Sequence, residues 1–147
     1  MTLLRIIAQS RRRPVFLLAF TLMILLSSCA SNSKFLVSEV IPAARGGVKV
    51  KKDDNQNYQI QVSIEYLAES SRLTPPKKTY VIWMESDRNN TKNIGQINTT
   101  ANSNKLKASF ETSSSFAPTR IFISAEDDGT VSYPGSPIVL TTGRLKG

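Results

Sequence analysis

A run of strictly alternating residues constrains the fold of this chain more than any other feature. Between Tyr58 and Tyr66, apolar residues alternate with polar ones over nine positions, which is the pattern of a β-strand with one buried face. Val48 and Val50 alternate with lysines just before this run, and the stretch 53–57 (Asp-Asp-Asn-Gln-Asn) separates the two. Because such residues favour tight turns, the pattern predicts a hairpin.

Further strands are predicted along the rest of the chain. Residues 79–86 are apolar and β-branched on both faces at their centre, as in a strand covered on both sides. Gly95 predicts a bulge in the strand that follows. Outside the first 28 residues, helical periodicity is limited to a single turn within 67–73. The predicted strands after the hairpin are 79–86, 92–99, 105–111, 120–125 and 138–142.

This succession of short strands predicts an all-β fold. We expect an immunoglobulin-like antiparallel β-sandwich of about seven strands, with Trp83 as its core anchor. Asp128-Gly129 is a favoured hairpin dipeptide and predicts a turn before the last strand. Pro134 and Pro137 predict that this last strand is interrupted or lies at an edge.

The composition excludes several kinds of catalytic and metal site. The 147 residues include no histidine and one cysteine, Cys29. Without histidine, the commonest general base and the commonest metal ligand are missing. One cysteine closes no disulfide within the chain and builds no thiolate zinc site. We therefore exclude Ser-His-Asp and Cys-His catalysis, and we expect no cofactor and no tight zinc or copper site.

The first 28 residues have the pattern of an export signal. Met1–Pro14 is polar and basic without an acidic residue, and Val15–Leu26 is apolar except for Thr21. A membrane-spanning helix needs about 20 apolar residues. The run from Val15 to Leu26 is shorter than that, so it fits the apolar region of a signal peptide.

A lipidation motif follows this apolar run. Leu26-Ser27-Ser28-Cys29 resembles the lipobox of bacterial lipoproteins. The resemblance implies a diacylglycerol on the Cys29 thiol, cleavage before Cys29, and an acyl chain such as palmitate on the new amine. An uncleaved anchor and an ordinary cleaved signal are the alternatives, but a lone cysteine at this position favours lipidation. The expected division is a lipoprotein signal peptide (1–28), a lipidated tether (29–34) and a β-sandwich domain (35–147).

The charge of the chain depends on this division. The formal net charge is +8, and without the four arginines of residues 1–28 it is +4. Lys49, Lys51 and Lys52 form the longest basic cluster, which at alternating strand positions indicates a solvated face more than a phosphate-binding surface. A lipid-anchored envelope protein is not expected to meet nucleic acid. Ala30 does not demand retention in the inner membrane by known sorting rules, so we expect the outer membrane, facing the periplasm.

Several later segments together resemble a known family. These segments are Tyr80–Glu85, Ile94–Ile97, Lys107–Glu111 and Pro118–Asp127. The set is similar to the extracytoplasmic domain of anti-sigma-K-type factors and of related lipid-anchored envelope proteins, over roughly residues 40–142. The resemblance implies a small β-sandwich without established catalytic residues. True anti-sigma factors have a cytoplasmic sigma-binding segment and a full transmembrane helix, neither of which precedes Cys29, so sigma-factor binding is not expected.

For the other candidate sites, a structural role is favoured over a functional one. Glu126-Asp127-Asp128 and Asp53-Asp54 offer oxygen ligands for calcium, but consecutive carboxylates point in different directions, which favours turns. The loop around Ser70–Lys78 is a candidate binding loop, or a rigid Pro-Pro crossover between sheets. Trp83 and Tyr80 form either a carbohydrate platform or part of the core, and the core is favoured. Tyr133 is a better candidate for an exposed aromatic residue.

The sequence therefore predicts a non-catalytic protein with a binding or structural role. Its expected partners are the membrane, through the lipid on Cys29, and an envelope protein or polysaccharide. The alternative is a sensory or regulatory module for the state of the envelope, as the anti-sigma resemblance suggests. An enzyme with Ser/Lys chemistry is the weakest alternative, because no motif places a serine, a lysine and an oxyanion hole together.

Overall fold

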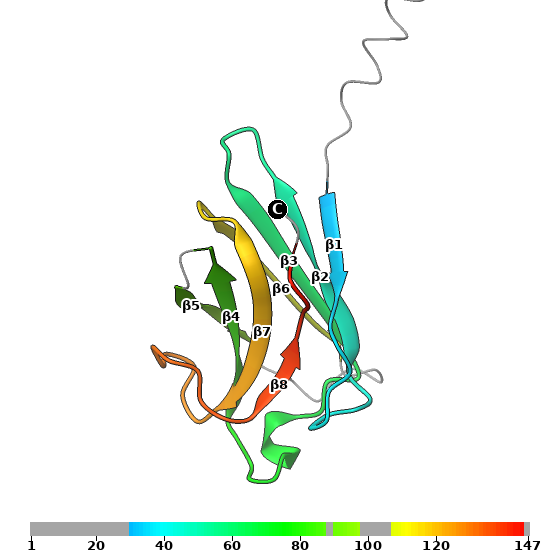
Figure 1. Ribbon diagram of the computed structural model, residues 1–147. Coiled ribbons are helices and arrows are strands. Elements are labelled where there is room, and N and C mark those ends of the chain that lie inside the picture. The colour runs from blue at the N-terminus through cyan, green and yellow to red at the C-terminus, as the bar shows by residue number, and fades with distance from the viewer. Residues whose placement is uncertain (1–29, 88–89, 98–106, 146–147) are drawn as a thin grey trace, which may run out of the picture.

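Two four-stranded antiparallel sheets pack face to face in the computed structural model, which describes residues 30–87, 90–97 and 107–145 (Figure 1). One sheet has the order β1-β2-β3-β6 and the other β5-β4-β7-β8. The prediction of an all-β sandwich is confirmed. The strands are β1 (Ala30–Lys34), β2 (Arg45–Lys52), β3 (Tyr58–Glu65), β4 (Thr79–Ser86), β5 (Thr91–Ile97), β6 (Ala108–Ser114), β7 (Pro118–Glu126) and β8 (Ile138–Thr141).

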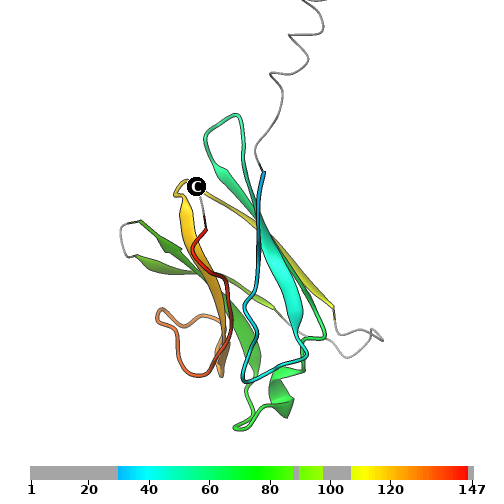
Figure 2. The same cartoon turned by 45° about the vertical axis from the view of Figure 1, so that its right-hand side comes forward.

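The connections between the sheets follow the immunoglobulin-like pattern. β3 pairs with β6 in one sheet and β4 with β7 in the other. The chain therefore crosses between the sheets after β3, after β5 and again after β6, as Figure 2 shows from the side. The first crossing contains the 3-10 turn η1 (Ser70–Arg72), which confirms the single helical turn predicted there. The inward faces of both sheets form the main core.

The β2–β3 hairpin forms where the alternation predicts it. Lys52 pairs with Tyr58, and residues 53–57 make the turn. Oδ1 of Asp53 accepts hydrogen bonds from the backbone N–H groups of Asn55 and Asn57, each over 2.9 Å. These bonds, above all the one from Asn57, hold the pKa of Asp53 below its ordinary value.

β4 is buried on both faces, as its sequence predicts. Tyr80 and Met84 point into the main core between the sheets. Trp83 is fully buried too, but it lies on the other face of β4, where it packs against Phe122 and Val131. The prediction of a buried Trp83 is confirmed, whereas its place in the inter-sheet core is wrong. Successive residues of a strand point to opposite faces, and the even-numbered residues of β4 face the core between the sheets.

The tether predicted for residues 29–34 is wrong where the structure describes it. Ala30–Lys34 form β1, which pairs with β2 along its whole length, and this strand brings the total to eight. Ser31 and Ser33 are half-buried opposite Val50 and Val48. An edge strand is held by backbone hydrogen bonds on one side, so small polar side chains suffice and the sequence resembles a linker.

The chain joins the two sheets immediately after β1. Phe35 forms a bridge with Thr142, and the backbone N–H of Leu36 donates to the carbonyl of Thr141 over 2.8 Å. β8 is therefore an edge strand whose end is partly covered by the segment that follows β1. The edge position predicted from its flanking prolines is confirmed.

The bulge predicted at Gly95 is confirmed, and the chain turns at Gly129–Thr130 as predicted, but this turn does not join β7 and β8 as a tight hairpin. The register of β4 and β5 shifts opposite Gly95, whose φ is +151°. In contrast, β7 ends at Glu126 and β8 begins only at Ile138. The loop between them lies over Trp83, and the side-chain nitrogen of Asn93 donates to the carbonyls of Gly129 and Val131.

Candidate functional site

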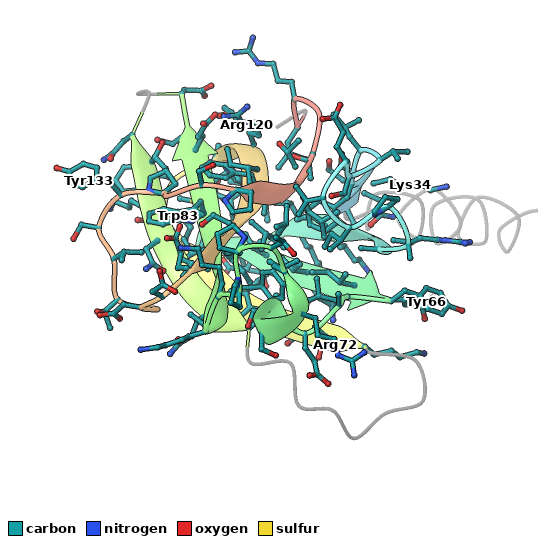
Figure 3. The ribbon with its side chains drawn as sticks, turned by 90° about the horizontal axis from the view of Figure 1, so that it is seen from below. Lys34, Tyr66, Arg72, Trp83, Arg120 and Tyr133 are labelled. Carbon is teal, nitrogen blue, oxygen red and sulfur yellow. The ribbon has the colours of Figure 1, made fainter. Side chains whose placement is uncertain are left out.

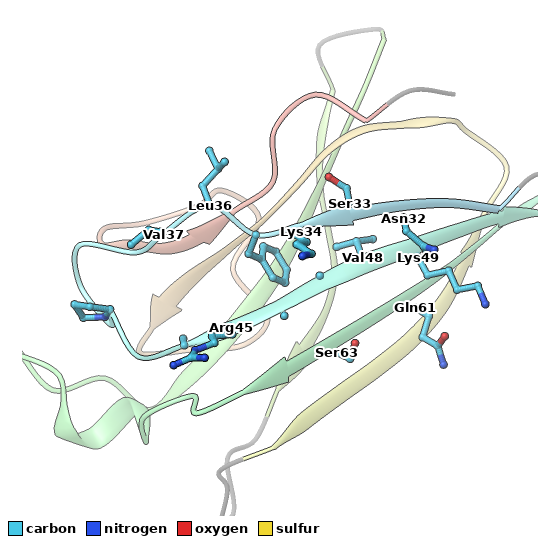
Figure 4. Close-up of a pocket in the computed structure, with 15 residues that line it drawn as sticks. Asn32, Ser33, Lys34, Leu36, Val37, Arg45, Val48, Lys49, Gln61 and Ser63 are labelled. Atoms are coloured by element: carbon cyan, nitrogen blue, oxygen red, sulfur yellow. The ribbon is translucent and has the colours of Figure 1, made fainter.

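A hollow of the described chain lies along β1 and β2. It has a volume of about 770 Å³ and is lined by β1, the segment after it, the first half of β2 and two residues of β3 (Figure 4). We call this hollow the basic groove. Its lining residues are Asn32, Ser33, Lys34, Phe35, Leu36, Val37, Pro42, Ala44, Arg45, Gly46, Gly47, Val48, Lys49, Gln61 and Ser63.

Two consecutive glycines in β2 explain why this part of the sheet has a hollow surface. Gly47 pairs with Ser63 on one side and with Lys34 on the other, on the face that points away from the core. A Cβ on Gly47 would lie 2.4 Å from the carbonyl oxygen of Ser33, and a Cβ on Gly46 would lie 2.0 Å from that of Ser63. The three strands therefore approach each other closely at the two glycines, and β2 has no side chain between Arg45 and Val48.

The groove is rimmed by cations. Lys34, Arg45 and Lys49 line it, and none of its lining residues is acidic. Residues directly opposite in an antiparallel pair share a face. Lys34 lies opposite Gly47, and Lys49 lies opposite Asn32 and Gln61, so the cations and the two amides project from the same side of the sheet. Figure 4 shows Lys49 and Gln61 extending together from neighbouring strands.

These cations form no ion pair within the described ranges, although Glu65 lies opposite Arg45 in the register of β2 and β3. Lys34 and Lys49 take part in none of the ion pairs found there, and the guanidinium of Arg45 lies 5.6 Å from the centre of the Tyr66 ring. The nearby Glu65 is instead paired with Lys107, whose Nζ lies 3.1 Å from its carboxylate. The β1–β2 half of the outer face is therefore positively charged.

The groove continues in both directions. Towards the β2–β3 hairpin, a smaller hollow of about 200 Å³ shares Lys49 and Gln61 and adds Lys51. It also contains Glu111, whose carboxylate accepts a hydrogen bond from Gln61. Towards the other end, a hollow of about 250 Å³ shares Leu36 and Val37 and runs along β8.

Exposed aliphatic side chains border the groove at this second end. Val37 is 88% exposed, Leu36 55%, Ile138 49% and Val40 41%. We call these four residues the apolar rim. All four residues line the same hollow beside β8. Single exposed apolar residues are normal on a protein surface, whereas a cluster of them is typical of a place where another molecule binds.

The predicted lipidation site, Cys29, lies outside the described residues, as do residues 1–28. The next residue, Ala30, is the first residue of β1 and lies opposite Lys51. The basic groove therefore begins within a few residues of the predicted lipidation site.

The acidic turns have structural partners. Asp128 accepts hydrogen bonds from the backbone N–H and the hydroxyl of Thr130, each over 2.8 Å, which lower its pKa. Asp127 pairs with Lys77 over 2.8 Å. Glu126 accepts hydrogen bonds from Ser124 and from the backbone of Gly135. Among the described residues, no group of three or more acidic or cysteine side chains is arranged to hold a metal ion.

The other candidates from the sequence are divided between core and surface. Tyr80 is buried, its hydroxyl donates to the carbonyl of Ala68 over 2.9 Å, and burial raises its pKa to about 12. Tyr133 is 85% exposed and extends away from the sheets in Figure 3, far from the basic groove in that view. In the Ser70–Lys78 loop, the backbone N–H of Lys77 donates to the carbonyl of Ser70, so the crossover is closed by its own hydrogen bonds.

Sequence reasoning treated Lys49, Lys51 and Lys52 as a solvated face and missed Lys34 and Arg45. The available signal was the Gly46-Gly47 pair, because glycines inside a strand often mark a place where a ligand or another backbone approaches. Lys34 gave no such signal, since its position beside Gly47 follows only from the pairing of β1 with β2.

No family model, no curated protein and no solved structure matches this chain. A function is therefore inferred from the sequence, the fold and the basic groove. In the part of the chain that the structure describes, no helix is long and apolar enough to cross a membrane.

Proposed function

We propose that this protein is a lipid-anchored β-sandwich of the bacterial cell envelope that acts by binding a partner and not by catalysis. The observation that carries the binding role is the basic groove. It combines three cations, two amides and the apolar rim on one exposed surface. Such a mixture of charged, polar and apolar groups recognises a ligand by shape and charge.

The leader sequence supports the anchor. A basic segment, a short apolar run and Leu26-Ser27-Ser28-Cys29 follow each other in the order that lipoprotein processing requires. Several acyl chains, each contributing about 0.8 kcal/mol per buried CH₂, make such an attachment effectively permanent. Because β1 starts at Ala30, the sandwich would stand directly on the bilayer surface without a tether.

The anchor is tested by metabolic labelling with a palmitate analogue. The wild-type chain and a Ser28→Gly control, which keeps a small residue before the cysteine, should both incorporate the label. Cys29→Ala should incorporate none and keep its leader. Equal labelling of Cys29→Ala and wild type would refute the anchor.

The binding role is tested by two experiments in the native bacterium: crosslinking and gene deletion. If the protein binds a partner, crosslinking should recover it together with an envelope protein, and this recovery should decrease when Lys34 and Lys49 are replaced by glutamine. If deletion changed transcription while no partner depended on the groove, the regulatory alternative would replace the binding role.

A further inference from the structure

We propose that the basic groove binds an extended acidic segment of a partner protein, with carboxylates at alternate positions and apolar residues at the end that reaches the apolar rim. This inference rests on the binding role proposed above and names the chemistry of its partner.

The spacing of the cations supports an extended partner. Arg45, Lys49 and Lys51 all point outward from β2, and Lys34 lies opposite Gly47, where β2 itself has no side chain. Lys34 thus supplies the positive charge missing between Arg45 and Lys49. Since an antiparallel strand rises about 3.4 Å per residue, successive cations are about 7 Å apart along the sheet. Alternate side chains of an extended peptide have the same spacing.

The hollow above Gly47 lets a second backbone approach. Ser63 and Gly47 form its floor, and the amides of Asn32 and Gln61 stand beside Lys49. Hydroxyl and amide groups can donate to and accept from a peptide backbone, which leaves the cations free for the carboxylates. In a fully side-chain-covered sheet, the partner backbone would be held about 10 Å away.

The apolar rim favours a peptide over a saccharide. Its four members are aliphatic, whereas sugar rings usually stack on aromatic faces. Phe35 lines the groove but packs against the main core, and the ring of Tyr66 is covered by the guanidinium of Arg45. The aliphatic residues Leu36 and Val37 instead suit the apolar side chains of a peptide.

This arrangement indicates which end of the groove takes the apolar residues of the bound segment and which part takes its carboxylates. The apolar rim lies at the Arg45 end of β2, and the cations continue from there to Lys51 near the hairpin. Glu111 lies in the cross-strand row of Gln61 and Lys49, so it reduces the positive charge near Lys49 and Lys51 more than near Arg45 and Lys34.

The test compares two labelled peptides of identical composition by fluorescence anisotropy, with the full chain in a neutral detergent. One is Val-Val-Glu-Thr-Glu-Thr-Glu-Thr, and the other has its glutamates in one block, Val-Val-Glu-Glu-Glu-Thr-Thr-Thr. The alternating peptide should bind at least about tenfold more tightly. Equal affinity for both peptides would overturn the proposal, because it would indicate attraction to net charge alone.

Matched variants locate the binding. Lys34→Gln combined with Lys49→Gln should weaken binding of the alternating peptide at least about tenfold. Lys78→Gln combined with Lys92→Gln removes the same charge outside the groove and should leave affinity within about twofold, because such charges are screened. Trp83 emission checks that both variants are folded. If the two pairs had equal effects, the groove would not be the site.

Two further ligands test the choice of partner. Polygalacturonate and vesicles of phosphatidylglycerol should each bind more weakly than the alternating peptide, and tighter binding of either would overturn the peptide assignment. The peptide result does not depend on the lipid anchor. If Cys29 is lipidated but neither peptide binds, the peptide inference is wrong and the anchor stands. If the alternating peptide binds but Cys29 is not lipidated, the anchor is wrong and the peptide inference stands.

Discussion

The indole nitrogen of Trp83 in β4 donates a hydrogen bond to the hydroxyl of Ser124 in β7 over 2.8 Å. The same hydroxyl donates to the carboxylate of Glu126, which also accepts from the backbone N–H of Gly135 over 2.7 Å. This chain of bonds connects the β7–β8 loop to the outer face of its sheet. A buried indole therefore has its N–H satisfied although it lies outside the main core.

Ser124→Ala should lower the free energy of unfolding by about 1–3 kcal/mol, because it leaves the buried N–H of Trp83 without its acceptor. Ser132→Ala, at an exposed position of the same loop, is the matched control and should have little effect. Urea unfolding followed by Trp83 emission measures both. Equal stability of the two variants would mean that the bond contributes nothing.

Trp83→Ala should cost about 3–5 kcal/mol, since it removes a fully buried ring that packs on Phe122. The native emission of Trp83 should be blue-shifted and should move to the red on unfolding. An emission maximum like that of free tryptophan in the native protein would contradict the burial of this ring.

Gly46→Ala should destabilise the protein strongly, while Gly143→Ala should be close to neutral. Gly46 has φ of +153°, and an added Cβ would lie 2.0 Å from the carbonyl oxygen of Ser63; at Gly143 an added Cβ meets nothing within 4 Å. The strained backbone alone costs about 1–3 kcal/mol. Thermal unfolding of both variants checks the prediction, and a stable Gly46→Ala would show that β2 and β3 are not this close.

Alkaline pH should lower the free energy of unfolding through Tyr80. Burial raises the folded-state pKa of Tyr80 from 10.0 to about 12. The stability that its neutral form contributes is fully present below pH 10 and is lost progressively as the pH rises from there towards about 12. Denaturant unfolding across this range should show that loss in the wild type and a smaller one in Tyr80→Phe. Identical pH dependence would mean that another group is responsible.

Removal of β1 should lower the melting temperature. A chain that begins at Ala30 keeps the β1–β2 pairing, whereas one that begins at Phe35 uncovers the edge of β2 and exposes more of Val48 and Val50. For a domain of this size, each 1 kcal/mol lost corresponds to about 2–8 °C. If the two chains melted at the same temperature, residues 30–34 would be a tether after all.

Much of the sandwich could be predicted because its strands carry local signals. The alternation from Tyr58 to Glu65, the turn at Asp53, the two-sided apolarity of β4 and the bulge at Gly95 each follow from a few neighbouring residues. β1 could not be predicted in this way, because its polar side chains carry no alternation and its strand character comes from pairing with β2.

The candidate site was less predictable than the fold for the same reason. Gly46, Gly47 and Lys49 lie in one stretch of sequence, but Lys34 and Gln61 join them only through the registers of β1 and β3 with β2. The face of β4 on which Trp83 lies could not be predicted either. Both faces of β4 are apolar, so the alternation of residues does not indicate which face packs against the other sheet.

The mass of the mature N-terminal peptide tests the central claim, a lipid-anchored envelope protein, most directly. The protein is extracted from bacterial membranes, digested and analysed by mass spectrometry. We predict an N-terminal peptide that begins at Cys29 and carries a diacylglycerol on its thiol and an acyl chain on its amine. An unmodified peptide that begins at any other residue, or a chain that retains Met1, would contradict the account.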